Sequence, residues 1–267
     1  MSEMNKTETA AATKHLEVAG LHIRCLTRGS GRPVLVLHGW GGSIESVLPV
    51  VTSLASVATV YAIDAPGFGE SDPPPRAWGT GEYAEFINEL LETLALSRLT
   101  VVGHSFGGRI AIRLAVEYPH RVEKLILVNS AGIRPRRKAR YYRRVALAKV
   151  GKALGRFAGL PGRRLQARIV RSTASPDYLS AGELRSTFVR VVNEDLAPLL
   201  PKIAVPTLLL WGGRDEETPL SQGRLMEKLI PDAGLVVFER AGHYSYIDEP
   251  DAFGRVARNF VEAKGVA

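Results

Sequence analysis

Gly103-His104-Ser105-Phe106-Gly107 is the most informative segment of this sequence. It follows the apolar run Leu99-Thr100-Val101-Val102 and precedes a helix-like run over residues 108–115. A serine at a sharp turn between a buried strand and a helix exposes its hydroxyl above the sheet. The two glycines permit that turn, because a side chain at either position would clash across it. Such pentapeptides also arise by chance, so the surrounding sequence has to support the interpretation.

On both sides of the pentapeptide, apolar runs alternate with helical patterns, which is typical of parallel strands joined by helices. Because the apolar runs are continuous, we expect helices on both faces of the sheet. The sequence therefore predicts an α/β fold with a mostly parallel, eight-stranded sheet. Its predicted strands are a hairpin within residues 15–27, then 34–37, 59–63, 99–102, 124–128, 206–211 and 234–238; the predicted helices cover about 82–94, 108–118 and 250–262.

The chain divides into a core and an insertion with a very different charge. We predict a flexible N-terminus over residues 1–13, an α/β core over 14–130 and 201–267, and an inserted helical lid over 131–200. Residues 131–171 hold fourteen Lys and Arg and no Asp or Glu, which leaves 21 basic and 27 acidic residues elsewhere. This basic lid is either a solvated cover, the reading we favour, or a surface that attracts anionic substrates, membranes or nucleic acid.

Composition excludes several classes of protein. With 45% hydrophobic and 23% charged residues, the 267-residue chain has the composition of a soluble globular protein. The polar first residues lack the apolar stretch of a secretion signal, so we expect a cytoplasmic protein. Cys25 is the only cysteine, which rules out an intramolecular disulfide. We expect no metal, no cofactor and no nucleic-acid partner, because no ligand cluster or binding motif is present; the oligomeric state stays open.

A serine hydroxyl needs a nearby base to become a good nucleophile, and the base needs a third group to orient it. In open parallel sheets, functional residues collect at the carboxyl ends of the strands. His243 follows the predicted strand 234–238, and Asp215 follows the predicted strand 206–211. Ser105, Asp215 and His243 are therefore the candidate catalytic residues.

Together these motifs resemble the α/β-hydrolase fold family over nearly the whole chain. The turns His38-Gly39-Trp40 and Asp64-Ala65-Pro66-Gly67-Phe68-Gly69, the serine turn and the loops of Asp215 and His243 occur in the family's order. The resemblance implies that Ser105 is the nucleophile, His243 the base and Asp215 the acid. It also implies an oxyanion hole formed by the backbone N–H groups of Trp40 and Phe106.

Several polar neighbours of these motifs have simpler interpretations. We expect His38 and His104 to hydrogen-bond loop backbone, and Asp64 to hold its own turn. Asn129 stands where some family members carry the catalytic acid, and as an amide it leaves that role to Asp215. Glu216 and Glu217 are alternatives to Asp215 as the acid, although a solvated acidic face is the simpler interpretation of both.

The resemblance implies acyl transfer, most simply by a carboxylesterase acting on a small-molecule ester. A carbon–carbon bond hydrolase of the meta-cleavage type and a slow-turnover receptor remain alternatives with the same triad. A peptidase that reads a free amino terminus would need acidic residues near the pocket, and residues 131–171 hold none. Candidate pocket residues are Trp40, Phe106, Tyr141, Tyr142 and Phe188, each of which also fits the core.

Overall fold

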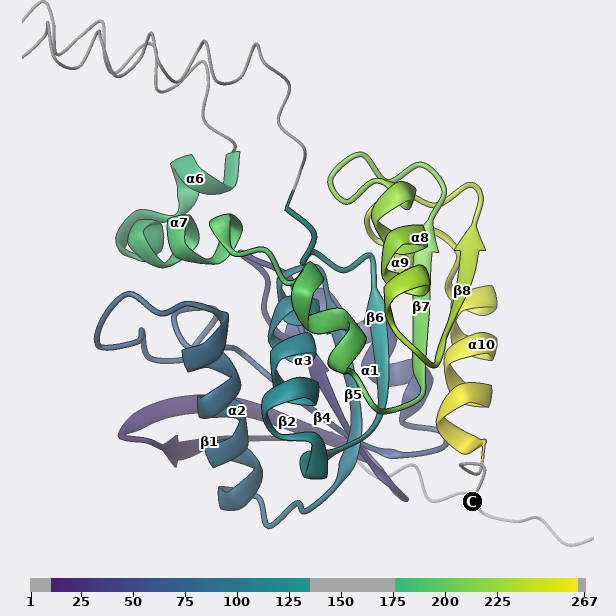
Figure 1. Cartoon of the computed structure of the whole chain (residues 1–267). Coiled ribbons are helices and arrows are strands. Elements are labelled where there is room, and N and C mark those ends of the chain that lie inside the picture. The colour runs from purple at the N-terminus through teal and green to yellow at the C-terminus, as the bar shows by residue number, and fades with distance from the viewer. Residues whose placement is uncertain (1–10, 135–175, 264–267) are drawn as a thin grey trace, which may run out of the picture.

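The computed structural model describes residues 11–134 and 176–263 (Figure 1). In these residues, eight strands form one sheet in the order β1-β2-β4-β3-β5-β6-β7-β8. The pairs β1–β2 and β2–β4 are antiparallel, and every later pair is parallel. The predicted α/β fold with a mostly parallel sheet is confirmed. The strands are β1 Ala12–Val18, β2 Leu21–Gly29, β3 Pro33–Leu37, β4 Thr59–Ile63, β5 Leu99–His104, β6 Val122–Val128, β7 Thr207–Gly212 and β8 Ala233–Phe238.

Helices cover both faces of the sheet, as its apolar strands require. Buried side chains of α2, α3 and α8 belong to one core cluster, and those of α1, α9 and α10 belong to a second cluster on the opposite face. Each long helix turns an apolar stripe toward the sheet. The helices of the core are α1 Ile44–Leu54, α2 Thr80–Thr93, α3 Phe106–Glu117, α8 Leu220–Leu229, α9 Ser245–Asp248 and α10 Pro250–Glu262.

The N-terminal hairpin lies at one edge of the sheet. Ala19 and Gly20 connect β1 to β2, and both have positive φ angles, 52° and 75°. This backbone combination is the one that matches the twist of two hairpin strands. The predicted hairpin is confirmed, and β1 begins at Ala12, two residues before the predicted start of the core at residue 14.

Strand β5 lies in the middle of the sheet, between β3 and β6. All six of its residues are buried, as expected for a central strand covered by helices on both faces. Its carboxyl end therefore lies near the centre of the edge where the parallel strands finish, and Ser105 follows directly.

The segment between β6 and β7 is an insertion in the core. Its described part contains α6 Pro176–Ser180 and α7 Arg185–Asn193, which lie beyond the end of the sheet toward which β8 points (Figure 1). The chain leaves and re-enters the core at neighbouring points, since the Leu196 N–H donates to the Gly132 carbonyl at 2.9 Å. Leu196 and Leu200, inside the predicted lid range, pack in the core cluster of α3 and α8.

Polar contacts attach α7 to the core. The Glu194 carboxylate, just after α7, accepts hydrogen bonds from the N–H (3.1 Å) and the hydroxyl of Thr80 at the start of α2. The buried Arg109 of α3 donates to the Glu194 carbonyl at 3.1 Å. Most of the basic run, with Tyr141 and Tyr142, lies outside the described residues. No helix within residues 11–134 and 176–263 is long and apolar enough to cross a membrane.

Candidate active site

Ser105 occupies the sharp turn between β5 and α3. Its φ angle is 51°, an uncommon value for a residue with a side chain. A Cβ added to Gly107 would clash with the Leu37 and His38 carbonyl oxygens, and one added to Gly103 would clash with the backbone of Gly107. The glycines are therefore needed for close packing of this turn. The Ser105 N–H donates to the Val128 carbonyl at 3.1 Å, which fixes the turn against β6.

Asp215 and His243 meet at the same edge of the sheet. Asp215 follows β7 and His243 follows β8, and the Oδ2 atom of Asp215 lies 2.9 Å from Nδ1 of His243. Both residues are buried. The His243 carbonyl also accepts a hydrogen bond at 3.0 Å from Nε2 of His104, the residue before Ser105. The structure thus brings the two loops together beside the serine turn.

The carboxylate of Asp215 is held by further donors. Asn129 Nδ2 and Thr218 Oγ1 lie 2.7 and 2.6 Å from its Oδ2, and the N–H groups of Glu217 and Thr218 each lie 2.9 Å from its Oδ1. Burial alone would raise the pKa of Asp215, but hydrogen bonds from His243, Thr218 and Asn129 lower it to about 2. Asp215 is therefore ionised over the whole ordinary pH range.

The outer nitrogen of His243 faces a second carboxylate. Its Nε2 lies 3.4 Å from Oε2 of Glu217. Among the hydrogen bonds of the described residues, none joins the Ser105 hydroxyl to His243; the serine turn contacts the His243 loop through His104. The sequence placed Glu217 on a solvated face; its side chain is 64% exposed, yet it also reaches the imidazole.

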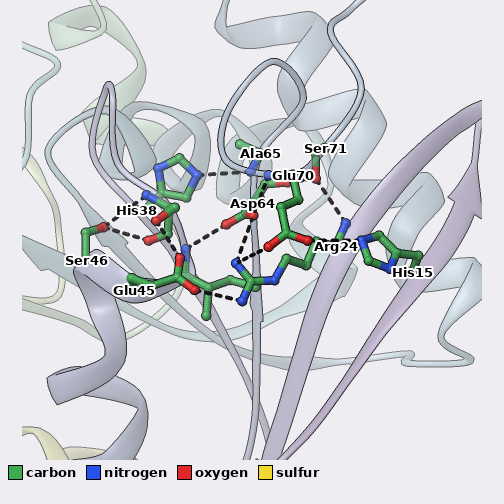
Figure 2. Close-up of polar contacts among 11 residues, drawn as sticks. His15, Arg24, His38, Glu45, Ser46, Asp64, Ala65, Glu70 and Ser71 are labelled. Atoms are coloured by element: carbon green, nitrogen blue, oxygen red, sulfur yellow. Dashed lines mark hydrogen bonds and ion pairs between the residues drawn. The ribbon is translucent and has the colours of Figure 1, made fainter.

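His38 and Asp64 support the turn that follows β3 (Figure 2). His38 Nδ1 donates to the Gly39 carbonyl at 2.7 Å, and its Nε2 accepts the Ala65 N–H at 3.0 Å, which fixes a neutral ring. Burial lowers the pKa of His38 and so favours the same neutral state. Asp64 accepts the N–H groups of Ile44 (2.7 Å) and Glu70 (2.9 Å), so it holds the start of α1 as well as its own turn.

Three of the predicted pocket residues lie together. The Trp40 ring is 5.3 Å from the Phe106 ring and 5.0 Å from the Phe188 ring of α7, measured between centroids. Phe68, which the sequence reasoning did not select, joins them at 4.9 Å from Trp40. An apolar cluster therefore connects the insertion to the turn after β3. Tyr141 and Tyr142 are outside the described residues.

Comparison with known families agrees with this arrangement. A sequence model of the alpha/beta hydrolase fold matches residues 32–250. The chain belongs to the α/β-hydrolase fold family. The predicted resemblance is confirmed.

Relatives of this α/β hydrolase carry out more than one reaction. A pimeloyl-[acyl-carrier protein] methyl ester esterase of Legionella pneumophila is 28% identical, over 91% of this chain and 100% of that protein. A 2-hydroxy-6-oxo-6-phenylhexa-2,4-dienoate hydrolase of Burkholderia cepacia is 27% identical, over 98% of this chain and 99% of that protein. The solved structure of an esterase from Exiguobacterium antarcticum is 26% identical and has a TM-score of 0.75. The match covers 94% of this chain and 100% of the esterase. These similarities support a hydrolase.

Two residues at this hydrolase site have roles that the sequence did not predict: Thr218 was not singled out, and Glu217 was named only as an alternative acid. Thr218 carries a signal, because a threonine three residues after an aspartate commonly bonds back to its carboxylate. The contact between Glu217 and His243 has no sequence signal, since it depends on the direction of one exposed side chain. No group of three or more His, Cys, Asp or Glu in the described part of the chain is arranged to hold a metal ion.

Proposed function

We propose that the chain is a serine hydrolase that cleaves carboxylic esters, with Ser105 as nucleophile, His243 as base and Asp215 as acid. The observation that carries the proposal is the 2.9 Å contact between Asp215 and His243 beside the positive-φ serine turn. An ionised, buried carboxylate on Nδ1 leaves Nε2 free to accept a proton and stabilises the imidazolium that forms.

The reaction begins when the Ser105 oxygen attacks the ester carbonyl carbon and its proton passes to Nε2 of His243. For this step Nε2 has to turn from Glu217 toward the hydroxyl. The tetrahedral intermediate collapses when its carbon–oxygen bond to the alcohol breaks and His243 protonates the leaving alkoxide. Water then attacks the acyl carbon while His243 takes its proton. The bond between that carbon and the Ser105 oxygen breaks, His243 returns the proton to the serine oxygen, and the acid is released.

The oxyanion would be stabilised by the N–H groups of Trp40 and Phe106. Phe106 is the first residue of α3, and the first N–H groups of a helix have no partner within it. Within the described residues, no group accepts a hydrogen bond from either N–H. A Cβ added to Gly39 would lie 3.4 Å from the Ser105 Cβ, so the turn that carries Trp40 packs directly on the serine. This packing supports a role for both donors.

Ester cleavage and carbon–carbon cleavage are the two candidate reactions, because relatives of similar identity are named for each. The same triad serves both, and the receptor alternative retains it with slow turnover. We favour ester cleavage because a serine, a base and an acid suffice for it. Coverage does not separate the two reactions, since the esterase relative matches 91% of this chain and the dienoate hydrolase relative 98%.

The test compares wild type with Ser105→Ala on p-nitrophenyl butyrate and on a 2-hydroxy-6-oxo-dienoate. We expect hydrolysis of the butyrate, and a loss of at least about 10³-fold in kcat for Ser105→Ala. The control is Ser56→Ala, because Ser56 is an exposed serine at the end of α1. Equal activity of Ser105→Ala and wild type would refute the nucleophile. Turnover of the dienoate alone would favour carbon–carbon cleavage, and no turnover with tight ligand binding would favour a receptor.

A further inference from the structure

Glu217 faces the side of His243 that is to receive the proton. The imidazole side chain is only 7% exposed, whereas Glu217 is 64% exposed and its Oε2 lies 3.4 Å from Nε2. Its backbone is fixed, because its N–H donates to Asp215 at 2.9 Å. Glu217 therefore stands at the boundary between the site and solvent, on a loop held by the proposed acid.

A second carboxylate, that of Asp177 in α6, lies close enough to interact with the charge of His243. Burial raises the pKa of Asp177, and the charge of His243 opposes that rise. Burial also raises the pKa of Tyr244, and the charges of Glu217 and Asp177 raise it further. Two carboxylates from different parts of the chain thus act on His243 and on its neighbour Tyr244. Both acidic residues lie outside residues 131–171, Asp177 in α6 and Glu217 in the loop after β7.

Neither carboxylate is neutralised by a basic side chain in the part of the chain that the structure describes. Among the described residues, Glu217 forms an ion pair only with His243. Within this part of the chain, an anionic group on a substrate bound beside Glu217 would therefore meet like charge close to the reacting atoms. Repulsion of this kind acts strongly at short range and is weakened by salt.

We infer that Glu217 is a specificity-determining residue that selects neutral esters over substrates carrying a carboxylate near the scissile bond. The inference rests on the proposed function and specifies its substrate class. Consider an ester whose carboxylate lies ~7 Å from Glu217. At the effective dielectric constant of a partly solvated site, its kcat/KM should be about threefold to tenfold lower than that of the neutral ester of the same length. The dienoate acids that some relatives are named for belong to the disfavoured class.

The test measures kcat/KM for p-nitrophenyl pentanoate and for p-nitrophenyl hydrogen glutarate, two esters with the same acyl length and leaving group. Glu217→Gln should raise the ratio of kcat/KM for the anionic ester to kcat/KM for the neutral ester about threefold to tenfold at low salt. This increase should be smaller in 1 M NaCl. Glu216→Gln is the matched control, because Glu216 is the exposed neighbour and loses the same charge. Its ratio should change less than about twofold.

An unchanged ratio in Glu217→Gln overturns the inference, and so does an equal rise in Glu216→Gln, which would indicate a general field. In both cases the proposed function stands, provided that wild type cleaves the neutral ester and Ser105→Ala does not. If wild type cleaves neither ester, the proposed function fails and the inference fails with it.

Discussion

Replacing the buried Asp64 by asparagine is expected to destabilise the fold by about 3 kcal/mol. Asp64 is 0% exposed, and its neighbours are all donors: Ile44 N–H at 2.7 Å, Glu70 N–H at 2.9 Å and Arg24 Nη1 at 3.4 Å (Figure 2). Asparagine offers one acceptor oxygen, so its NH₂ group faces a donor in either orientation. One buried N–H left unpaired costs about 1–3 kcal/mol, and the loss of charge weakens the remaining bonds by about 1 kcal/mol.

Urea unfolding and thermal melting measure this change, and a loss of about 3 kcal/mol should lower Tm by about 6–12 °C. Glu45→Gln is the matched control. Glu45 contacts the same guanidinium at 2.7 Å, but its side chain is 55% exposed, so its loss should cost less than about 1 kcal/mol. The reasoning is refuted if Asp64→Asn destabilises the protein no more than Glu45→Gln does.

Three further predictions concern charge and anchoring. Because the pKa of Asp215 is about 2, below its ordinary 3.8, its charge stabilises the fold above pH 4 and ceases to do so as pH falls through 2; the Tm difference between wild type and Asp215→Asn should narrow over that range. The buried Lys124 donates to carbonyls at the end of α10, so Lys124→Met should lose about 2–3 kcal/mol in urea unfolding, whereas the exposed Lys202→Met should lose less than about 0.5 kcal/mol. Glu194→Gln weakens the attachment of α7 to α2, so trypsin should cleave α7 about fivefold faster than in wild type or in the exposed control Glu183→Gln; equal cleavage rates would contradict this role.

The parallel strands could be predicted because each contains a run of apolar residues and is bounded by glycine, proline or polar turns. Helix α1 could not be predicted in the same way. It contains Pro49 and a high proportion of valine, a composition that disfavours helix in isolation. Burial of one face against the sheet, together with the Asp64 carboxylate on the Ile44 N–H, stabilises it instead. These contacts join residues 20 positions apart, beyond the reach of local patterns.

For the candidate site, the rule that functional residues follow parallel strands correctly predicted that Asp215 and His243 meet. The rule concerns the backbone and does not determine side-chain directions. It therefore gave no account of the Glu217 carboxylate beside His243 or of the way Thr218 holds Asp215. Whether Ser105 is the nucleophile stays a prediction that the kinetic test addresses.

The hydrogen bond between Gly132 and Leu196 means that the segment between them could be replaced by another. The two ends of residues 133–195 are held side by side by the core, so a replacement segment of another length would close a loop whose endpoints already exist. The entropy of closing such a loop grows only with the logarithm of its length. Segments from other hydrolases could therefore be transplanted between Gly132 and Leu196 as modules, while the serine turn and the strands stay as they are.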